Sequence, residues 1–304
     1  MRKEPISAPG RTSEIDMEFV TRRYCIGDLR FCVVAPPYPE QPNMTAFRVE
    51  EGSPDDPCLR ITPGEPLDET DLPCVSGTSF EAQYRRGDER VRVFFREDDK
   101  EGLLLRAEDR PNGDCDAVLA QDALSSLGGK LILLLMEVPL RLLRRGAVFL
   151  HASMIEVDGR AILFTAKKQT GKSTQAELWR AYRGARILNG DRALLQRRDG
   201  LWYAMGSPYC GTSDYCEKAE LPLAAVVQLS QAKENRVSRL PARTAVSACL
   251  EGCTYDPTDP AQTAAVMDLA LALYRDVPFY HLACLPDETA VACLEAALKQ
   301  ERVL

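Results

Sequence analysis

The sequence predicts an α/β fold preceded by a small antiparallel β-rich domain, and two observations support this. Short apolar stretches separated by glycine and proline follow one another from Met17 to about Arg110, which is typical of a strand meander. After Arg110, apolar stretches typical of strands alternate with stretches in which apolar residues recur at helical spacing. We therefore expect a β-rich domain over residues 1–115 and a larger α/β domain over residues 116–304.

Composition excludes several classes of protein. Of 304 residues, 45% are apolar and 27% charged, as in ordinary globular proteins, and the net charge of −7 repels the phosphates of nucleic acids. The longest apolar stretch, Leu131 to Leu143, is interrupted by Glu137, Pro139 and Arg141 and is too short to cross a bilayer. We expect neither a nucleic acid nor a membrane as partner.

The cysteines favour a reducing compartment. There are eleven, an odd number scattered through a long chain, and no apolar secretory segment is visible near Met1. We expect reduced thiols and a cytoplasmic protein. With only two histidines and no CxxC, a structural zinc site is not expected.

The first part of the chain contains predicted strands and one clear hairpin. Arg85-Arg86-Gly87-Asp88 separates two strand-like stretches and is a hairpin signal. The proline-rich stretches 35–42 and 54–66 separate other strands. The predicted strands are Phe19–Tyr24, Leu29–Val34, Ala46–Glu50, Thr78–Tyr84, Val91–Arg96 and Leu103–Arg106.

The second part is predicted to begin with helix. Residues 116–145 have mostly helical character, with a break at Gly128-Gly129. Asp158-Gly159 forms a turn between two strands, and Asp259-Pro260 and Asp287 begin the last two helices. The predicted strands are Ala147–Met154, Ala161–Thr165, Arg186–Leu188, Leu201–Met205 and Ala224–Leu229, and the predicted helices are Ser173–Tyr182, 260–274 and 288–300.

A loop between a strand and a helix has the composition of a phosphate-binding site. Residues 166–173 read Ala-Lys-Lys-Gln-Thr-Gly-Lys-Ser and fit a relaxed Walker A pattern, although the strict pattern has glycine in place of Ala166. Gly171 allows close approach of the backbone, and the helix that follows directs the positive end of its dipole at an anion. An ordinary structural turn is the alternative.

Each residue of this loop has a predicted role. Loop amides would wrap the phosphates, Lys172 would bridge the β- and γ-phosphates, and the Ser173 hydroxyl would ligate Mg²⁺. Lys167 and Lys168 would raise the local positive potential or point to solvent. The predicted nucleotide-binding residues are Ala166, Lys167, Lys168, Gln169, Thr170, Gly171, Lys172, Ser173 and Thr174.

An acid follows the next strand. Arg186-Ile-Leu-Asn189 ends in Gly190-Asp191, and the Asp191 carboxylate would lie beside the loop if the two strands are neighbours. There it would hold Mg²⁺ through water or accept the proton of an attacking hydroxyl. The alternative is that Asn189-Gly190-Asp191 is only a turn.

Together, His151-Ala-Ser-Met-Ile-Glu, the loop and Asn189-Gly-Asp-Arg resemble the catalytic domain of HPr kinase/phosphorylase, in the phosphoenolpyruvate carboxykinase-like group of P-loop kinases. The resemblance covers residues 147–230. It implies a mixed, strongly bent sheet carrying the P-loop, Mg-ATP as cofactor, and transfer of the γ-phosphate to a hydroxyl. It places Lys172 on the phosphates, Ser173 on the metal and Asp191 at the second position of an acid pair.

The chain departs from that family at two points. Gly190 stands where the pair has its first acid, and neither the HPr-binding segment nor the phosphorylase signature is recognisable. We therefore expect a kinase with another acceptor, such as serine in a protein, peptide or small molecule. A catalytically weak nucleotide-binding regulator and a simple NTPase are the alternatives. The absence of a Walker B acid counts against the NTPase, and the oligomeric state, a homo-oligomer included, is left open.

Weaker candidates remain. His151 would orient the phosphates or the acid, or be a packed histidine at a strand edge. The segment 206–218, with Lys218, is either a ligand lid or an ordinary surface loop. The basic cluster Lys233, Arg236 and Arg239 is either a solvated face or a phosphate contact.

Overall fold

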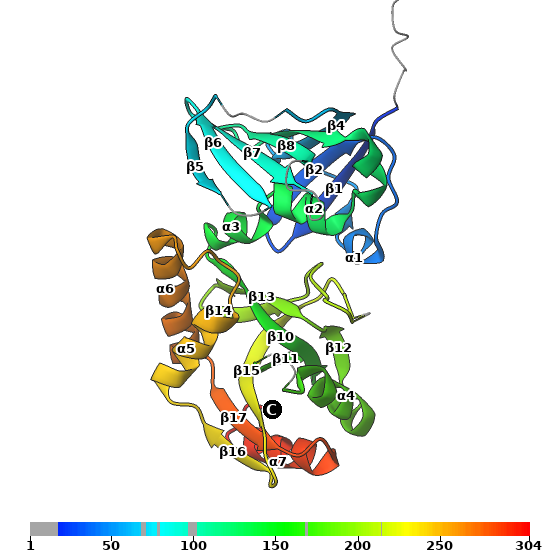
Figure 1. Ribbon diagram of the computed structural model, residues 1–304. Coiled ribbons are helices and arrows are strands. Elements are labelled where there is room, and N and C mark those ends of the chain that lie inside the picture. Colours follow the sequence, from blue (N-terminus) through cyan, green and yellow to red (C-terminus); the bar gives the residue numbers. More distant parts are fainter. Residues whose placement is uncertain (1–17, 68–70, 78–79, 97–101, 168–169, 214) are drawn as a thin grey trace, which may run out of the picture.

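The computed structural model describes residues 18–67, 71–77, 80–96, 102–167, 170–213 and 215–304. Its strands form two sheets, one from each part of the chain. Figure 1 shows the first sheet above the second, with α2 (Gly129–Leu135) and α3 (Val138–Leu143) on the side of the first sheet that faces the second. The fold is mixed α/β with flanking helices, as predicted.

The first sheet has nine strands in the order β3-β1-β2-β4-β9-β8-β7-β6-β5. β4 pairs with β2 and β9 in parallel, whereas the other pairings are antiparallel. The prediction of a purely antiparallel domain is therefore wrong at β4. The bounds are β1 Val20–Ile26, β2 Leu29–Ala35, β3 Arg48–Val49, β4 Cys58–Gly64, β5 Cys74–Gly77, β6 Glu81–Arg86, β7 Glu89–Phe95, β8 Leu103–Asp109 and β9 Cys115–Ala120.

The hairpin prediction is confirmed, and the helix prediction fails at one end. β6 and β7 pair across a two-residue turn at Gly87-Asp88. β9, in contrast, lies inside the segment predicted as helix. Its odd-numbered residues are buried and its neighbours partly exposed, up to the buried end at Ala120, a period of two that pairing with β4 and β8 stabilises. The first sheet thus ends at Ala120, and the division into two domains at 115/116 stays a prediction.

Short helices connect the two sheets. A 3₁₀ turn, η1 (Gln121–Ser126), leads to α2, whose N-cap is Gly128, so the predicted break at Gly128-Gly129 is confirmed. Glu137, with a φ of 45°, separates α2 from α3. The only other helix in the described first part is the single turn α1 (Pro42–Thr45).

The second sheet has eight strands and bends until it closes on itself. β11 pairs with both β10 and β15, so the circuit β11-β10-β13-β14-β15 is complete, with β17 and β16 beyond β15 and β12 on β10. Because β10 and β15 are long, each changes partner along its length. The bounds are β10 Ala147–Val157, β11 Arg160–Thr165, β12 Arg186–Asn189, β13 Arg192–Arg198, β14 Leu201–Met205, β15 Glu220–Gln231, β16 Arg236–Arg239 and β17 Phe279–Cys284.

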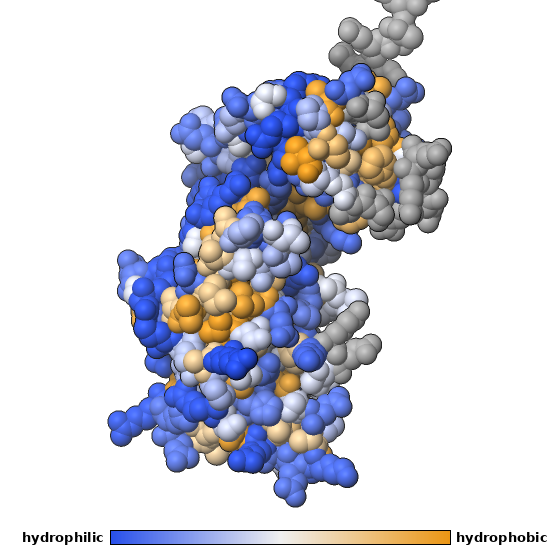
Figure 2. All heavy atoms as spheres, turned by 60° about the vertical axis from the view of Figure 1, so that its left-hand side comes forward, coloured by the Kyte–Doolittle hydropathy of each residue, from blue (hydrophilic) through white to orange (hydrophobic). Residues whose placement is uncertain are grey.

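Four helices pack around this second sheet. α4 (Lys172–Arg183) and α7 (Glu288–Gln300) share one apolar cluster with β11 and β17, whereas α5 (Ala242–Gly252) and α6 (Pro260–Asp276) share another. The predicted caps are confirmed, since Asp259 accepts from the first amides of α6 and Asp287 from α7. In Figure 2, hydrophobic residues gather on part of the face that α5 and α6 form, and hydrophilic residues cover the lower end.

One hydrophobic cluster joins the two parts. It contains residues of the first sheet, α2 and α3 together with Phe149, Leu194 and Met205 of the second sheet. Cys32 and Cys58, opposite each other on β2 and β4, form a disulfide, so the expectation of reduced thiols is wrong for this pair. Within the described residues, no helix combines the length and apolar character needed to cross a bilayer.

Candidate active site

The loop between β11 and α4 forms a tight turn at the edge of the second sheet. The amide and hydroxyl of Thr170 donate to the Lys167 carbonyl at 3.2 and 2.8 Å. Gly171, at the N-cap of α4, has a φ of 113°, a conformation that side chains with a Cβ rarely adopt. Lys168 and Gln169, both predicted to bind phosphate, lie outside the described residues.

The N-terminus of α4 has no acceptor of its own. Gly171 offers no side chain to cap it, and the first turn contains no acidic residue. The first amides of a helix lack intrahelical partners and carry partial positive charge. This end of α4 is therefore open to an anion from outside the helix.

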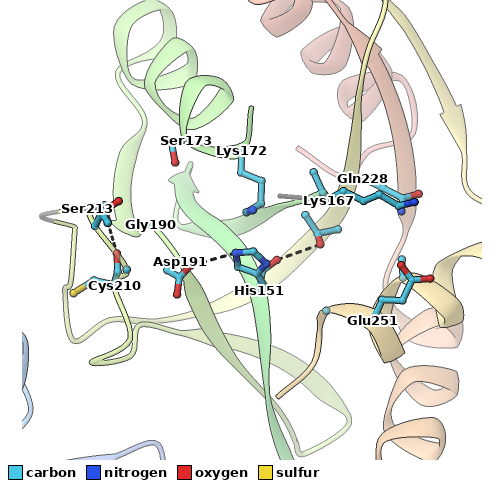
Figure 3. A pocket seen from close by; sticks show the side chains of 16 residues that line it. His151, Lys167, Lys172, Ser173, Gly190, Asp191, Cys210, Ser213, Gln228 and Glu251 are labelled. Carbon is cyan, nitrogen blue, oxygen red and sulfur yellow. Dashed lines mark hydrogen bonds and ion pairs between the residues drawn. The ribbon is translucent and has the colours of Figure 1, made fainter. Parts of the chain in front are cut away.

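A cavity of about 670 Å³ lies at this end of α4 (Figure 3). Of the predicted residues, those that line it come from β10, the loop, α4 and the segment between β12 and β13. They are His151, Ala166, Lys167, Lys172, Ser173 and Asp191, and residues 210–213 of the segment predicted as a ligand lid or a surface loop line it as well. Thr170, Gly171 and Thr174 instead line adjoining clefts on the other side of the loop.

Asp191 reaches the cavity by a route that differs from the prediction. β11 and β12 are not neighbours, because β10 lies between them and pairs with both. The end of β12 and the start of β13 lie along β10 in one register, with Met154 opposite Asn189 and His151 opposite Arg192, and the rest of β12 is shifted by a bulge. Only Gly190 and Asp191 separate β12 from β13, and β10 lies between these two strands and β11. Asp191 therefore reaches the loop across β10.

The turn at Asp191 is held by backbone and side-chain hydrogen bonds. The Asp191 carbonyl accepts from the Ala152 amide at 2.9 Å, and the Gly190 carbonyl accepts from the Ser153 hydroxyl at 3.2 Å. The buried Asn189 side chain accepts from the amides of Asp191 and Arg192 at 2.9 and 2.8 Å. The segment is therefore a turn, as its composition suggests, and that turn fixes the direction of a carboxylate.

His151 and Asp191 form a pair inside the cavity. His151 Nε2 lies 3.2 Å from Asp191 Oδ1, as the dashed line in Figure 3 shows. The hydrogen bond from His151 is the main cause that lowers the pKa of Asp191. Burial opposes this effect, and the charges of His151, Arg192 and Lys172 add to it. The net result is a pKa below the usual range, so Asp191 is ionised at neutral pH.

Lys172 faces the same space. Among the described residues its ammonium makes no hydrogen bond or ion pair, although the Asp191 charge is close enough to act on it. Burial lowers the pKa of Lys172, and Asp191 partly offsets that effect. A half-buried cation without a bonded partner, beside an uncapped helix end, is placed to meet an anion.

Gly190 is enclosed by the loop that follows β14. A Cβ at residue 190 would lie 2.0 Å from Ser213 Oγ and 2.6 Å from Ser213 Cβ. The Ser213 hydroxyl itself donates to the Cys210 carbonyl at 2.7 Å. The space that the first acid of a pair would need is therefore taken up by Ser213, a residue of the 206–218 segment.

Several cavity residues were missed by sequence reasoning. Gln228 is the polar residue in an apolar strand stretch, a signal that could have been used. Thr165, whose hydroxyl donates to the His151 carbonyl at 3.2 Å, and Glu251, at the end of α5, gave no signal of their own. Lys218, Lys233, Arg236 and Arg239 do not line this cavity, and Arg239 pairs with Glu301.

The residues present suit a cation only when a ligand supplies oxygens as well. In the described part of the chain, no three His, Cys, Asp or Glu side chains converge as a metal site. Ser173 and Asp191 line one cavity, and Mg²⁺ is commonly held by one or two protein oxygens together with phosphates. A Mg²⁺ that arrives with a polyphosphate fits this arrangement.

Comparison with known proteins adds little to this geometry. No family model matches the chain, and no curated protein matches it. Among solved structures, the chain is similar to the Hpr(Ser) kinase/phosphatase from Coxiella burnetii, at 12% identity and a TM-score of 0.31 over 51% of this chain and 96% of that chain. At that score the likeness carries no argument about function.

Proposed function

We propose that the protein is an ATP-dependent kinase that transfers the γ-phosphate to a hydroxyl group. The observation that carries the proposal is the convergence of Lys172 and the His151–Asp191 pair in one cavity at the uncapped N-terminus of α4. A positive helix end with a free lysine suits phosphates, and an ionised acid opposite suits a hydroxyl.

The positively and negatively charged residues of the cavity would have different roles. The loop amides and Lys172 bind the β- and γ-phosphates, and Ser173 with Asp191 holds the Mg²⁺ that neutralises them. Asp191 also orients the acceptor hydroxyl and takes its proton as the new P–O bond forms and the bond to the leaving ADP breaks. His151 orients Asp191 through the 3.2 Å contact.

The acceptor remains a hydroxyl of unspecified origin, with serine in a protein, a peptide or a small molecule as the candidates. The net charge of −7 disfavours nucleic acid as acceptor. The triphosphate itself is accommodated because positive charge is concentrated locally at α4.

Calorimetry with Mg-ATP tests binding, and phosphate transfer to serine-containing acceptors tests chemistry. Lys172→Ala should weaken binding and should slow transfer by about 10²–10³-fold, the usual cost of removing one group that stabilises transition-state charge. Asp191→Asn, which removes the proton acceptor but keeps a side-chain oxygen for Mg²⁺, should lose transfer and weaken binding far less. Wild-type protein that does not bind Mg-ATP would refute the proposal, and unchanged transfer in Asp191→Asn would remove Asp191 from it.

A nucleotide-binding regulator without efficient transfer is the second candidate, and Gly190 favours it. With Ser213 filling the space beside Gly190, a second acid cannot stand next to Asp191 in this arrangement. Tight Mg-ATP binding with no transfer to any acceptor would favour the regulator over the kinase.

A further inference from the structure

A second cleft, of about 340 Å³, adjoins the loop, and neither His151 nor Asp191 lines it. One wall comes from the loop and α4, and the other from the ends of β15 and β17. Its lining residues are Thr170, Gly171, Thr174, Gln175, Gln231, Ala232, Cys284, Leu285 and Pro286. Nothing in the function proposed above uses this cleft.

The sheet topology makes this cleft a natural ligand site. β11, β15 and β17 are adjacent and parallel, with Thr165 opposite Gln228 and Gln231 opposite Cys284. Their carboxyl ends therefore lie at one edge, where the loop also begins. In open α/β sheets, ligands bind outside the carboxyl ends of parallel strands.

One buried side-chain amide nitrogen in this cleft has no hydrogen-bond partner among the described residues. Gln175 is 2% exposed, and its Nε2 makes no hydrogen bond to any of these residues. Leaving a buried donor without a partner costs about 1–3 kcal/mol, so native proteins rarely keep one without a use. Gln175 lines the cleft, where a ligand atom can accept from it.

The opposite wall is mostly apolar, with Gln231 as its polar residue, and is held in place. Leu285 is half-buried beside Pro286, and the Leu285 amide donates to the Asn235 side chain at 2.8 Å. The Ala232 amide donates to the Cys284 carbonyl at 3.1 Å. Apolar residues that face a buried amide donor suit a flat ring that also has hydrogen-bond acceptors.

This cleft and the catalytic cavity are lined by two adjacent residues of α4. Ser173 lines the cavity and Thr174 lines the cleft, so the N-terminus of α4 separates the two. A triphosphate bound there with its γ-phosphate toward Lys172 and Asp191 would extend its other end into the cleft.

We infer that this cleft holds the nucleoside of the triphosphate, with Gln175 donating a hydrogen bond to the base or ribose and Leu285 and Pro286 against the ring. The inference rests on the proposed function, because the phosphates must occupy the loop. Another cleft of about 460 Å³ flanks α4 next to Glu177, but there the Glu177 carboxylate already accepts from Tyr215 and Arg180.

The test compares Mg-ATP with Mg-tripolyphosphate, which has the phosphates and no nucleoside, by calorimetry on the full chain. Wild-type protein should bind Mg-ATP at least about tenfold more tightly. Gln175→Leu should remove most of that difference and leave the tripolyphosphate affinity unchanged. Glu177→Gln, a matched change in the other cleft, should leave both affinities unchanged.

The possible results separate the two proposals. Equal affinities for ATP and tripolyphosphate in the wild type, or an undiminished difference in Gln175→Leu, overturn the nucleoside cleft while the phosphate loop stands. If Glu177→Gln binds ATP and tripolyphosphate with equal affinity, the nucleoside lies in the cleft next to Glu177, and the inference is overturned. Absence of binding by either compound overturns the proposed function as well. Thermal unfolding without ligand shows whether Gln175→Leu is folded.

Discussion

Arg92 of the first sheet and the polar groups at the N-terminus of α4 differ in whether their hydrogen bonds are satisfied. Arg92, 2% exposed, donates to both Asp109 oxygens and to the carbonyls of Leu134 and Leu135. At α4, Lys172 is half-buried, and within the described residues neither its ammonium nor Gln175 Nε2 has a bonded partner. A satisfied buried charge holds structure together, whereas unsatisfied donors gathered at cavities indicate a place for a ligand.

The pKa shifts follow the same division. The charges around Arg92 raise its pKa against the effect of burial, and those of Arg92 and Arg90 lower the pKa of Asp109 although burial raises it. For Lys172, burial prevails and the pKa is lowered. The protein therefore stabilises the charges of the first sheet by itself, but leaves the charge of Lys172 to be stabilised by an anion.

The largest expected effect comes from breaking the satisfied network. Arg92→Ala leaves the Asp109 carboxylate buried with fewer partners and should lower the free energy of unfolding by about 3–5 kcal/mol. Urea denaturation measures this. Arg48→Ala, which breaks the exposed pair with Glu40 in the same part of the chain, should cost no more than about 1 kcal/mol. Equal losses in the two variants would contradict the comparison.

A smaller effect is expected from filling the space beside Asp191. Gly190→Asp should lower the free energy of unfolding by about 1–3 kcal/mol, because its Cβ would meet Ser213 Oγ at 2.0 Å. Adding Ser213→Gly should recover part of that loss, which a double-mutant cycle measures. Additive losses would show that Ser213 is not what excludes an acid there. A gain in phosphate transfer by the double variant would support the kinase over the regulator.

The smallest effect is a pH dependence caused by Lys172. Because its pKa is lowered in the folded protein, the unfolded chain binds this proton more tightly. The free energy of unfolding should therefore rise with pH between the lowered pKa and the usual lysine value. Lys172→Met should remove that rise, as denaturation at a series of alkaline pH values would show. In wild-type protein, Mg-ATP affinity should fall over the same range, and an affinity independent of pH there would argue against Lys172 on the phosphates.

Local patterns accounted for many of the elements. The Gly87-Asp88 hairpin, the Asp158-Gly159 turn and the caps at Asp259 and Asp287 lie where sequence signals place them. β4 was not predicted because it lies in a proline-rich stretch. β9 was not predicted because its residues fit a helical period. Both strands are stabilised by parallel partners distant in the sequence, and no local signal reports such partners.

In the candidate site, too, local patterns did not report contacts between residues far apart in the chain. The loop residues were found from the Walker A spacing and Asp191 from its place after a strand, but the predicted adjacency of β11 and β12 was wrong, since β10 lies between them. His151, left open as a packed histidine, lies on that intervening strand and contacts Asp191. Gln175 was not singled out, because a glutamine in the first turns of a helix has no distinctive pattern.

By itself, the sequence determined that a strand, a glycine-containing turn and a helix follow one another at residues 161–183, since these depend on short-range propensity and the freedom of Gly171. Only the tertiary structure decided what faces that turn. The closed circuit of β11-β10-β13-β14-β15 brings His151 and Asp191 to one side of α4, and the parallel ends of β15 and β17 bring an apolar wall to the other. Such contacts join residues far apart in the chain, so their free energies of packing and hydrogen bonding exist only once the sheet has formed.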